Sequence, residues 1–288
     1  STKNINQNSI FIIEASSYQL EYSKLFYSKY AAILNISADH LERHRNLKNY
    51  LSIKFKLIKN QKKGSTAFIN KYDFNINKKI NKENYKSKII KANTKLKNKD
   101  LDIFKNNYFL SSSNKENLSF VLAIIKKFRI KKKIIVNVIK NFKGLKYRQQ
   151  IIFNKRNISI INDSKSTSYS SSLEMLKKSN NIYWLLGGIP KKGDKLNLSE
   201  VHYKNIKGFI FGKNSKKFSL DLKNKIKFKK FSNLKKALNE VLKDIKKDNY
   251  NKKTILFSPA AASFDSFINF EDRGSYFNRL IKKYINAR

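Results

Sequence analysis

Polar residues that directly follow apolar runs are the parts of this sequence best suited to chemistry. Glu14 and Ser16 follow the apolar run that starts at position 9, in the stretch EASSYQLE. A carboxylate at the carboxyl end of a buried strand, with hydroxyls at the start of the next helix, stands where α/β sheets bind ligands and metal ions. The alternative is a strand end followed by a helix that Ser16 or Ser17 caps. The residues alone leave both interpretations open.

A second cluster, NISADHLERH at positions 35–44, follows another apolar run. It contains two of the three histidines, His40 and His44, together with two acidic residues. Imidazole and carboxylate groups bind metal ions and exchange protons, although a single histidine is more often structural. Lys54 lies further on, in a stretch with helical spacing. In so lysine-rich a chain, a solvated surface lysine is the default interpretation.

Three further clusters lie in the second half of the chain: NDSKSTS at 162–168, LLGGIPKKGD at 185–194 and SPAAASFDSFINFEDRG at 258–274. An acid, a lysine and hydroxyls at a sheet edge can hold a charged ligand, and paired glycines let the backbone approach it closely. An ordinary capped turn is the alternative for each cluster. The sequence has no phosphate loop of the G-x-x-x-x-G-K-[ST] or G-x-G-x-x-G type and no G-x-S-x-G elbow.

The composition excludes several classes of site. The chain has no cysteine, which rules out disulfides, thiolate metal sites and cysteine nucleophiles. It has no run of about 18 apolar residues that would predict a membrane span, and its first residues lack the pattern of a signal peptide. The net charge of +43 invites a nucleic-acid interpretation. The excess is mostly lysine spread along the whole chain, with Pro and Gly scarce, which indicates an A/T-rich coding bias more than a phosphate-binding surface rich in arginine.

Alternating apolar runs and amphipathic stretches predict an α/β fold. In the first part we expect strands at 9–14, 31–35, 65–70 and 88–91, helices at 50–60, 114–128 and 132–142, and mainly loops over 71–100. Lys143-Gly144 breaks the pattern and predicts two domains, 1–144 and 145–288. In the second domain we expect strands at 150–153, 158–161, 183–186, 208–211 and 254–257, and helices at 170–178, 215–224, 233–246 and 276–285. Such a series predicts a Rossmann-like, mostly parallel sheet.

Taken in order, the five clusters resemble the sequence blocks of the Mur ligases, and most closely those of the branch that adds D-glutamate. The resemblance runs from Phe11 to Leu280, and the closing block at 258–274 is its most specific part. It implies a central domain of the Mur ligase ATPase type, incomplete at its start, followed by a Rossmann-like domain that binds the amino acid.

The resemblance also implies roles for residues of the first domain. Glu14 would be a ligand of the nucleotide's Mg²⁺, and His40 a ligand of a second Mg²⁺. Lys54 would be carbamylated by carbon dioxide and bind metal as the carbamate, and these three residues form the implied catalytic group. Ser16 and Gln19 would lie beside the substrate. Asn114 and Asn117 would lie on the adenine side of ATP.

In the second domain, the resemblance implies that Arg148 and Asp163 close over ATP. The implied D-glutamate pocket consists of Lys165, Thr167, Lys191, Ser263 and Phe270. The implied reaction joins D-glutamate to UDP-N-acetylmuramoyl-L-alanine through an acyl phosphate, with ATP, two Mg²⁺ ions and the lysine carbamate. The expected protein is a cytoplasmic monomer without a specific nucleic-acid partner.

The sequence departs from the family pattern at its beginning. The family's UDP-binding domain and phosphate loop precede EASSYQLE, and neither is found in these residues. We therefore expect the 288-residue chain alone to have no ligase activity. Two alternatives remain: a related amide ligase of the Mur or folylpolyglutamate synthase type, and a non-catalytic basic protein that binds nucleic acid. A steep, linear log–log dependence of affinity on salt would indicate the latter.

Overall fold

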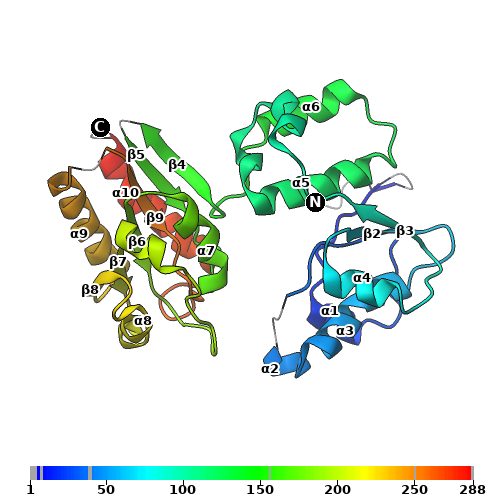
Figure 1. The fold of residues 1–288 in the computed structure, drawn as a ribbon, viewed down its shortest axis with the longest axis horizontal. Helices are drawn as coiled ribbons and strands as arrows, with labels where there is room; N and C mark the ends of the chain where they lie inside the picture. The colour runs from blue at the N-terminus through cyan, green and yellow to red at the C-terminus, as the bar shows by residue number, and fades with distance from the viewer. Residues whose placement is uncertain (1–4, 7–8, 38–40, 156, 250, 287–288) are drawn as a thin grey trace. The chain divides into compact units, whose positions relative to one another are not determined.

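The computed structural model describes residues 5–6, 9–37, 41–155, 157–249 and 251–286 (Figure 1). The chain forms two compact units, Ser1–Lys143 and Gly144–Arg288. The helices that the structure describes are all too short or too polar to cross a membrane.

The first unit is built on a parallel sheet in the order β1 (Tyr30–Ile33), β2 (Thr66–Asn70) and β3 (Lys88–Ala92). Both faces of β2 are buried. Helix α3 (Leu47–Lys59) packs against one face through Phe55 and Ile58, and α5 (Ser112–Ile125) packs Phe120 against Phe68 on the other. The remaining helices of the unit are α1 (Ser17–Tyr22), α2 (Leu41–His44), α4 (Phe74–Ile80) and α6 (Lys132–Asn141).

Most predicted elements of the first unit are confirmed to within a few residues, but the strand predicted at 9–14 is wrong. That segment is irregular, and the side chain of Ile12 is 97% exposed. A strand requires hydrogen-bonded neighbours, and β1, β2 and β3 are the only strands that the described part of this unit contains. The prediction of loops over 71–100 also missed α4, which Asp73 caps by accepting a bond from the Ile76 amide.

The second unit contains a six-stranded sheet in the order β4 (Gln150–Lys155), β5 (Ile158–Asn162), β9 (Lys253–Phe257), β6 (Ile182–Leu186), β7 (Ile206–Phe211) and β8 (Lys227–Phe231). Only β4 is antiparallel to its neighbour. The predicted α/β fold with a mostly parallel sheet is therefore confirmed. Strand β8 was not predicted, because it lies at the edge of the sheet and its sequence KFKKF is mostly lysine, without a regular apolar alternation.

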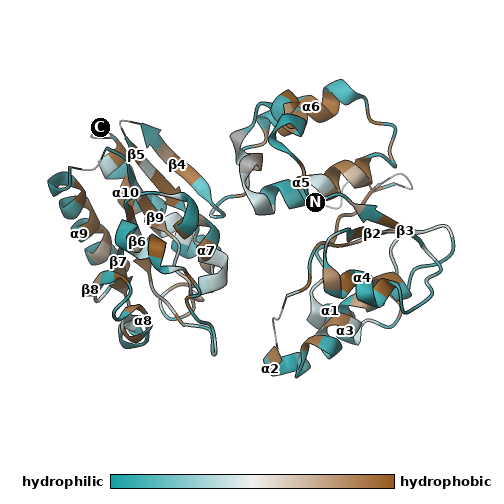
Figure 2. Cartoon of the chain, viewed as in Figure 1, coloured by the Kyte–Doolittle hydropathy of each residue, from teal (hydrophilic) through white to brown (hydrophobic). Residues whose placement is uncertain are grey.

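Helices cover both faces of this sheet. On one face, α7 (Tyr169–Lys178) and α8 (Ser215–Leu222) pack around Trp184. On the other, α9 (Leu234–Lys247) and α10 (Phe270–Asn286) pack around Phe257. The buried face of α9 carries five residues at helical spacing, opposite a hydrophilic face (Figure 2): Leu234, Ala237, Leu238, Val241 and Ile245. Each large apolar side chain buried in this way contributes roughly 1.5–3 kcal/mol.

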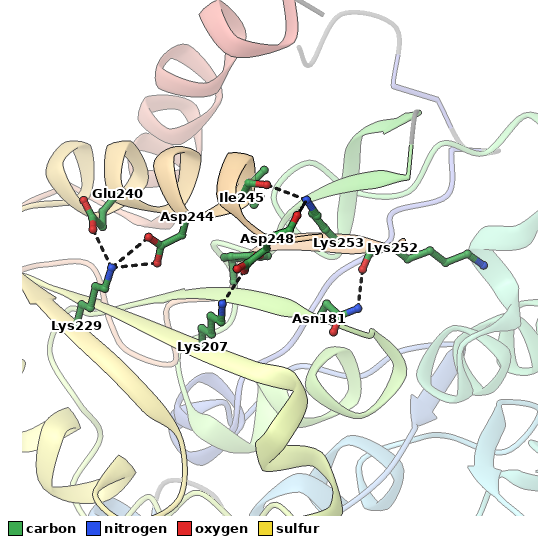
Figure 3. A network of polar contacts seen from close by, with 10 residues as sticks. Asn181, Lys207, Lys229, Glu240, Asp244, Ile245, Asp248, Lys252 and Lys253 are labelled. Carbon is green, nitrogen blue, oxygen red and sulfur yellow. Dashed lines mark hydrogen bonds and ion pairs between the residues drawn. The ribbon is translucent and has the colours of Figure 1, made fainter. Parts of the chain in front are cut away.

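Acidic residues on α9 and directly after it form ion pairs with lysines of the neighbouring strands (Figure 3). Lys229 of β8 binds Glu240 at 2.8 Å and Asp244 at 3.1 Å, and Lys207 of β7 binds Asp248 at 2.6 Å. With 20 acidic residues against 63 basic ones, the chain has too few acids to give each lysine an acidic partner of its own. Partly exposed pairs of this kind contribute only about 0–1 kcal/mol each, so the apolar core dominates the stability of the unit.

Candidate active site

Three neighbouring strands of the second unit end at the same edge of its sheet. The order β5–β9–β6 brings together the loops that follow Asn162, Phe257 and Leu186. The chain passes from β5 to β6 and later returns to insert β9 between them, which is the kind of switch point where α/β sheets bind ligands. Three of the predicted clusters are thereby gathered at one sheet edge.

Backbone hydrogen bonds tie these loops to one another. Ile189 and Ala262 exchange two bonds, at 2.9 and 3.0 Å. The Gly187 amide donates to the carbonyl of Pro259 at 3.0 Å, and the Asp163 amide donates to the carbonyl of Phe257 at 2.7 Å. The loops therefore form one connected framework.

The turn after β6 needs glycine at both of its first two positions. Gly187 has a φ of 154° and Gly188 a φ of 132°. A Cβ on Gly187 would lie 2.1 Å from the carbonyl oxygen of Phe211, and a Cβ on Gly188 would lie 2.3 Å from that of Ala262. Both close approaches are to backbone atoms, which cannot move aside as a flexible side chain can.

Replacing Gly187 with alanine is therefore expected to destabilise the second unit. The backbone strain and the overlap with Phe211 together are expected to lower the free energy of unfolding by about 2 kcal/mol. Urea denaturation measures the change, with Gly193→Ala as the control. Gly193 also has a positive φ, 77°, but nothing lies within 4 Å of where its Cβ would stand. Equal losses in the two variants would contradict a role for the close approach.

Asp163 is buried inside the framework, with 3% of its surface exposed. Its Oδ1 accepts a bond from the Gln149 amide, and its Oδ2 accepts one from the Ser258 hydroxyl, both at 3.0 Å. Burial raises the pKa of Asp163 to about 7, against the opposing effects of these two bonds and of the Arg148 charge. The carboxyl group therefore titrates near neutral pH.

The raised pKa of Asp163 makes stability depend on pH with a definite sign. An unfolded aspartate has a pKa of about 3.9. Between that pH and about 7, the folded chain binds more protons than the unfolded one, so the free energy of unfolding falls as pH rises. Over pH 4 to 8, we expect Asp163→Asn to gain roughly 3 kcal/mol relative to the natural chain. Urea denaturation of both proteins at several pH values measures this, and a pH-independent difference would contradict it.

Arg273 is the most deeply buried cation of the framework, with 1% of its surface exposed. Its Nε donates to Ser164 Oγ at 3.1 Å and its Nη2 donates to the Ser164 carbonyl at 2.8 Å. Ser164 Oγ in turn donates to the carbonyl of Phe270 at 2.8 Å. Burial lowers the pKa of Arg273 to about 10, so the guanidinium remains charged at neutral pH.

The residues predicted for the D-glutamate pocket lie on this framework. Lys165 is exposed, and its Nζ lies 4.0 Å from the centre of the half-buried Phe270 ring. Thr167 and Lys191 are exposed, on the loops after β5 and β6, and Ser263 is buried on the loop after β9. Three of the five residues thus present surface on neighbouring loops, and the half-buried Phe270 lies at the start of α10. Such an arrangement can bind a small anionic ligand.

The carboxyl edge of the sheet in the first unit carries a separate polar network. Glu116 of α5 accepts bonds from the side-chain amides of Asn35 at 3.0 Å and Asn70 at 3.3 Å. The hydroxyl of Thr94 donates to Asn70 Oδ1 at 2.9 Å. The last residue of β2 and residues just after β1 and β3 are therefore held together at this edge. Asn35 is also the first residue of the predicted NISADHLERH cluster.

The other residues predicted in the first unit have separate surroundings. Ser16 and Gln19 cap α1 through reciprocal bonds of 3.2 and 2.8 Å, which is the structural alternative for that cluster. Glu14 is exposed on the irregular segment before them. His40 lies outside the described residues. Lys54 is half-buried on α3, with its Nζ 5.4 Å from the centre of the Tyr50 ring.

The two predicted adenine-side asparagines differ in exposure. Asn114 is buried, and its side-chain amide donates to the carbonyl of Tyr108 at 2.8 Å. Asn117 is exposed on the same helix, α5. Asn114 therefore holds the preceding turn in this structure, while Asn117 is open to a ligand. Arg148 is exposed and belongs to the second unit, just before β4.

Comparison with known proteins identifies the family. Residues 2–136 match the Mur ligase middle domain. The chain is 33% identical over 292 residues to the UDP-N-acetylmuramoylalanine--D-glutamate ligase of Rickettsia felis, covering 95% of this chain. It is 34% identical to the Rickettsia prowazekii protein of the same name, covering 96% of this chain. The chain belongs to the Mur ligase family. It spans 65% and 66% of the length of these two relatives.

Solved structures of Mur ligases and their relatives share this fold. The MurF ligase of Thermotoga maritima in complex with ADP matches with a TM-score of 0.60 at 13% identity, covering 90% of this chain and 63% of that one. FolC of E. coli in complex with ADP matches with a TM-score of 0.59 at 10% identity, covering 89% and 63%. At such low identity these likenesses show the fold alone.

Several residues of this Mur ligase chain hold the site together although sequence reasoning gave them no role. Arg273 and Gly274 lie within the closing block at 258–274, but the sequence of that block does not reveal that the two residues are buried. Ser258 and Ser172 extend the Asp163 network through a hydroxyl contact of 2.8 Å. In the first unit, Glu116 is one acidic residue in the polar first turns of α5, and no sequence pattern distinguishes it.

The magnesium sites that the family resemblance implies are not assembled by the described residues. Within that part of the chain, no three His, Cys, Asp or Glu side chains gather closely enough to hold a metal ion. The one described acidic residue of the implied set, Glu14, is exposed on an irregular segment. The described donors therefore do not fit the ion by themselves.

Proposed function

We propose that this chain forms the catalytic core of a cytoplasmic, monomeric ligase that joins D-glutamate to UDP-N-acetylmuramoyl-L-alanine with ATP. The observation that carries the proposal is the connected framework at the β5–β9–β6 edge, which gathers Lys165, Ser263 and Phe270. Relatives that match nearly the whole chain are named for this reaction, and two structures of the same fold hold ADP.

The proposed chemistry has two steps. A carboxylate oxygen of the UDP-linked substrate attacks the γ-phosphorus of ATP, ADP leaves, and an acyl phosphate forms. The amine of D-glutamate then attacks the acyl carbon, phosphate leaves with the former carboxylate oxygen, and an amide remains. Lys165 and Lys191 bind the carboxylates of D-glutamate, and Arg148 offsets charge on the transferring phosphoryl group.

The amino-acid requirement for ADP release tests this function. We would join the chain to the preceding segment of the Rickettsia felis relative and measure ADP release from ATP with the UDP-linked substrate. D-Glutamate is expected to support release at least about 100-fold faster than L-glutamate, L-alanine or L-lysine. The chain without the added segment is the control and is expected to be inactive. Equal rates with all four amino acids, or a clear preference for another one, would contradict the assignment.

A further inference from the structure

The segment that leads into β4 has an unusual backbone. Tyr147 and Gln149 both have a positive φ, 60° and 45°. This left-handed conformation costs a non-glycine residue of order 1 kcal/mol or more and persists only where the surroundings hold it. Arg148 stands between these two residues, and its side chain is exposed.

The aromatic ring of Tyr147 rests directly on Gly274, in the first turns of α10. A Cβ added to Gly274 would lie 2.4 Å from Tyr147 Cδ1 and 2.6 Å from its Cγ. The ring therefore fills the space that any other residue at position 274 would need. This contact explains a glycine inside a helix, where the residue otherwise lowers stability by about 0.5–1 kcal/mol relative to alanine.

Hydrogen bonds hold the backbone of the same segment from both sides of Arg148. The Lys165 amide donates to the carbonyl of Tyr147 at 2.9 Å. The Gln149 amide donates to Asp163 Oδ1 at 3.0 Å. The segment is thereby bonded to the loop that carries Asp163 and Lys165.

We propose that Tyr147 is a positioning residue for Arg148. Its ring, seated on Gly274, and the bonds to Asp163 and Lys165 hold residues 147–149 as a fixed part of the second unit. Arg148 is consequently presented in one direction from the same framework that carries Lys165. The role of Arg148 in binding ATP rests on the proposed function. The fixed conformation of residues 147–149 does not depend on it.

Hydrogen exchange of the 288-residue chain, without nucleotide, tests the holding of this segment. We expect Gly274→Ala and Tyr147→Ala each to accelerate exchange of the Gln149 amide at least about tenfold, because local opening becomes easier. Tyr147→Phe keeps the ring and is expected to preserve protection. Cleavage by trypsin after Arg148 should rise in the two alanine variants relative to cleavage after Lys143. Unchanged exchange of Gln149 in both alanine variants would overturn the proposal.

A double variant separates the contact from a general loss of folding. If Gly274→Ala loosens the whole unit, Gly274→Ala with Tyr147→Ala is expected to restore slow exchange in β6, because the added methyl group then has room. The Gln149 amide should stay fast in that double variant. Protection of Gln149 equal to that of the natural chain would show that the ring does not hold the segment.

The ligase assay provides the second readout. Tyr147→Ala is expected to lower kcat at least about tenfold, and Tyr147→Phe to restore it, because Arg148 contributes only where it is correctly directed. Fast exchange at Gln149 with an unchanged kcat would overturn the positioning role of Tyr147. An assembled ligase that releases no ADP with any amino acid would instead refute the proposed function, and the exchange result would still decide whether the segment is held.

Discussion

Replacing Arg273 with alanine is expected to lower the free energy of unfolding of the second unit by about 4 kcal/mol. The guanidinium is almost fully buried and donates two bonds to Ser164. Alanine would leave the buried Ser164 carbonyl without this donor and would open a cavity the size of the lost side chain. Urea denaturation of the chain measures the change.

The control for this prediction lies on the same helix. Arg279 of α10 is exposed, and its guanidinium carbon lies 5.7 Å from the centre of the Tyr276 ring. Arg279→Ala should change the free energy of unfolding by less than about 0.5 kcal/mol, as is usual for surface substitutions. If both alanine variants unfold at the same urea concentration, Arg273 does not hold the loops together. Arg273→Lys should resemble the alanine variant more than the natural chain, because an ammonium group cannot make the same forked contact.

The family resemblance implies a carbamate on Lys54, so replacing Lys54 with arginine is expected to reduce ligase activity at least about 100-fold, an effect of the size seen when a charge-stabilising group near the reacting atoms is lost. Carbon dioxide adds only to a neutral amine, and the product is a carbamate anion. Arginine stays positively charged at all accessible pH values and cannot form it. Lys54 is half-buried on α3, with its Nζ 5.4 Å from the centre of the Tyr50 ring.

Carbon-13 NMR with labelled bicarbonate tests the carbamate on the chain itself. The natural chain should show a carbamate carbonyl signal that is absent from Lys54→Arg. Lys59→Arg is the matched control, since Lys59 is exposed at the end of the same helix, and it should keep both the signal and the activity. A signal that persists in Lys54→Arg, or equal activity losses in the two variants, would contradict the role of Lys54.

The sequence predicted the parts of the fold that local patterns determine. Strands β5, β6, β7 and β9 are short apolar runs that are buried on both faces, so their composition alone is enough to predict them as strands. Edge strand β8 and the short helix α4 carry more lysines than buried residues, and no apolar periodicity distinguishes them. The run at 9–14 has the composition of a strand, but pairing depends on neighbours that composition does not reveal.

The candidate site shows the same division. Parallel strands place their following loops at one edge, so the gathering of the loops that carry Lys165, Lys191 and Ser263 could be anticipated once the strands were recognised. The contacts that hold these loops join residues far apart in sequence: Arg273 and Ser164 are separated by 109 positions. Their burial and hydrogen bonds arise only from tertiary packing, which is why sequence reasoning gave Arg273 no role.

Transfer of an ¹⁸O label is the measurement that tests the proposed ligase chemistry most directly. The UDP-linked substrate would carry ¹⁸O in its terminal carboxylate and would react with ATP and D-glutamate on the chain joined to the preceding segment of its Rickettsia felis relative. Attack of that carboxylate on ATP predicts that the phosphate released with each amide carries one oxygen from the label. Phosphate without ¹⁸O, released at the same rate whether or not D-glutamate is present, would contradict a ligase that works through an acyl phosphate.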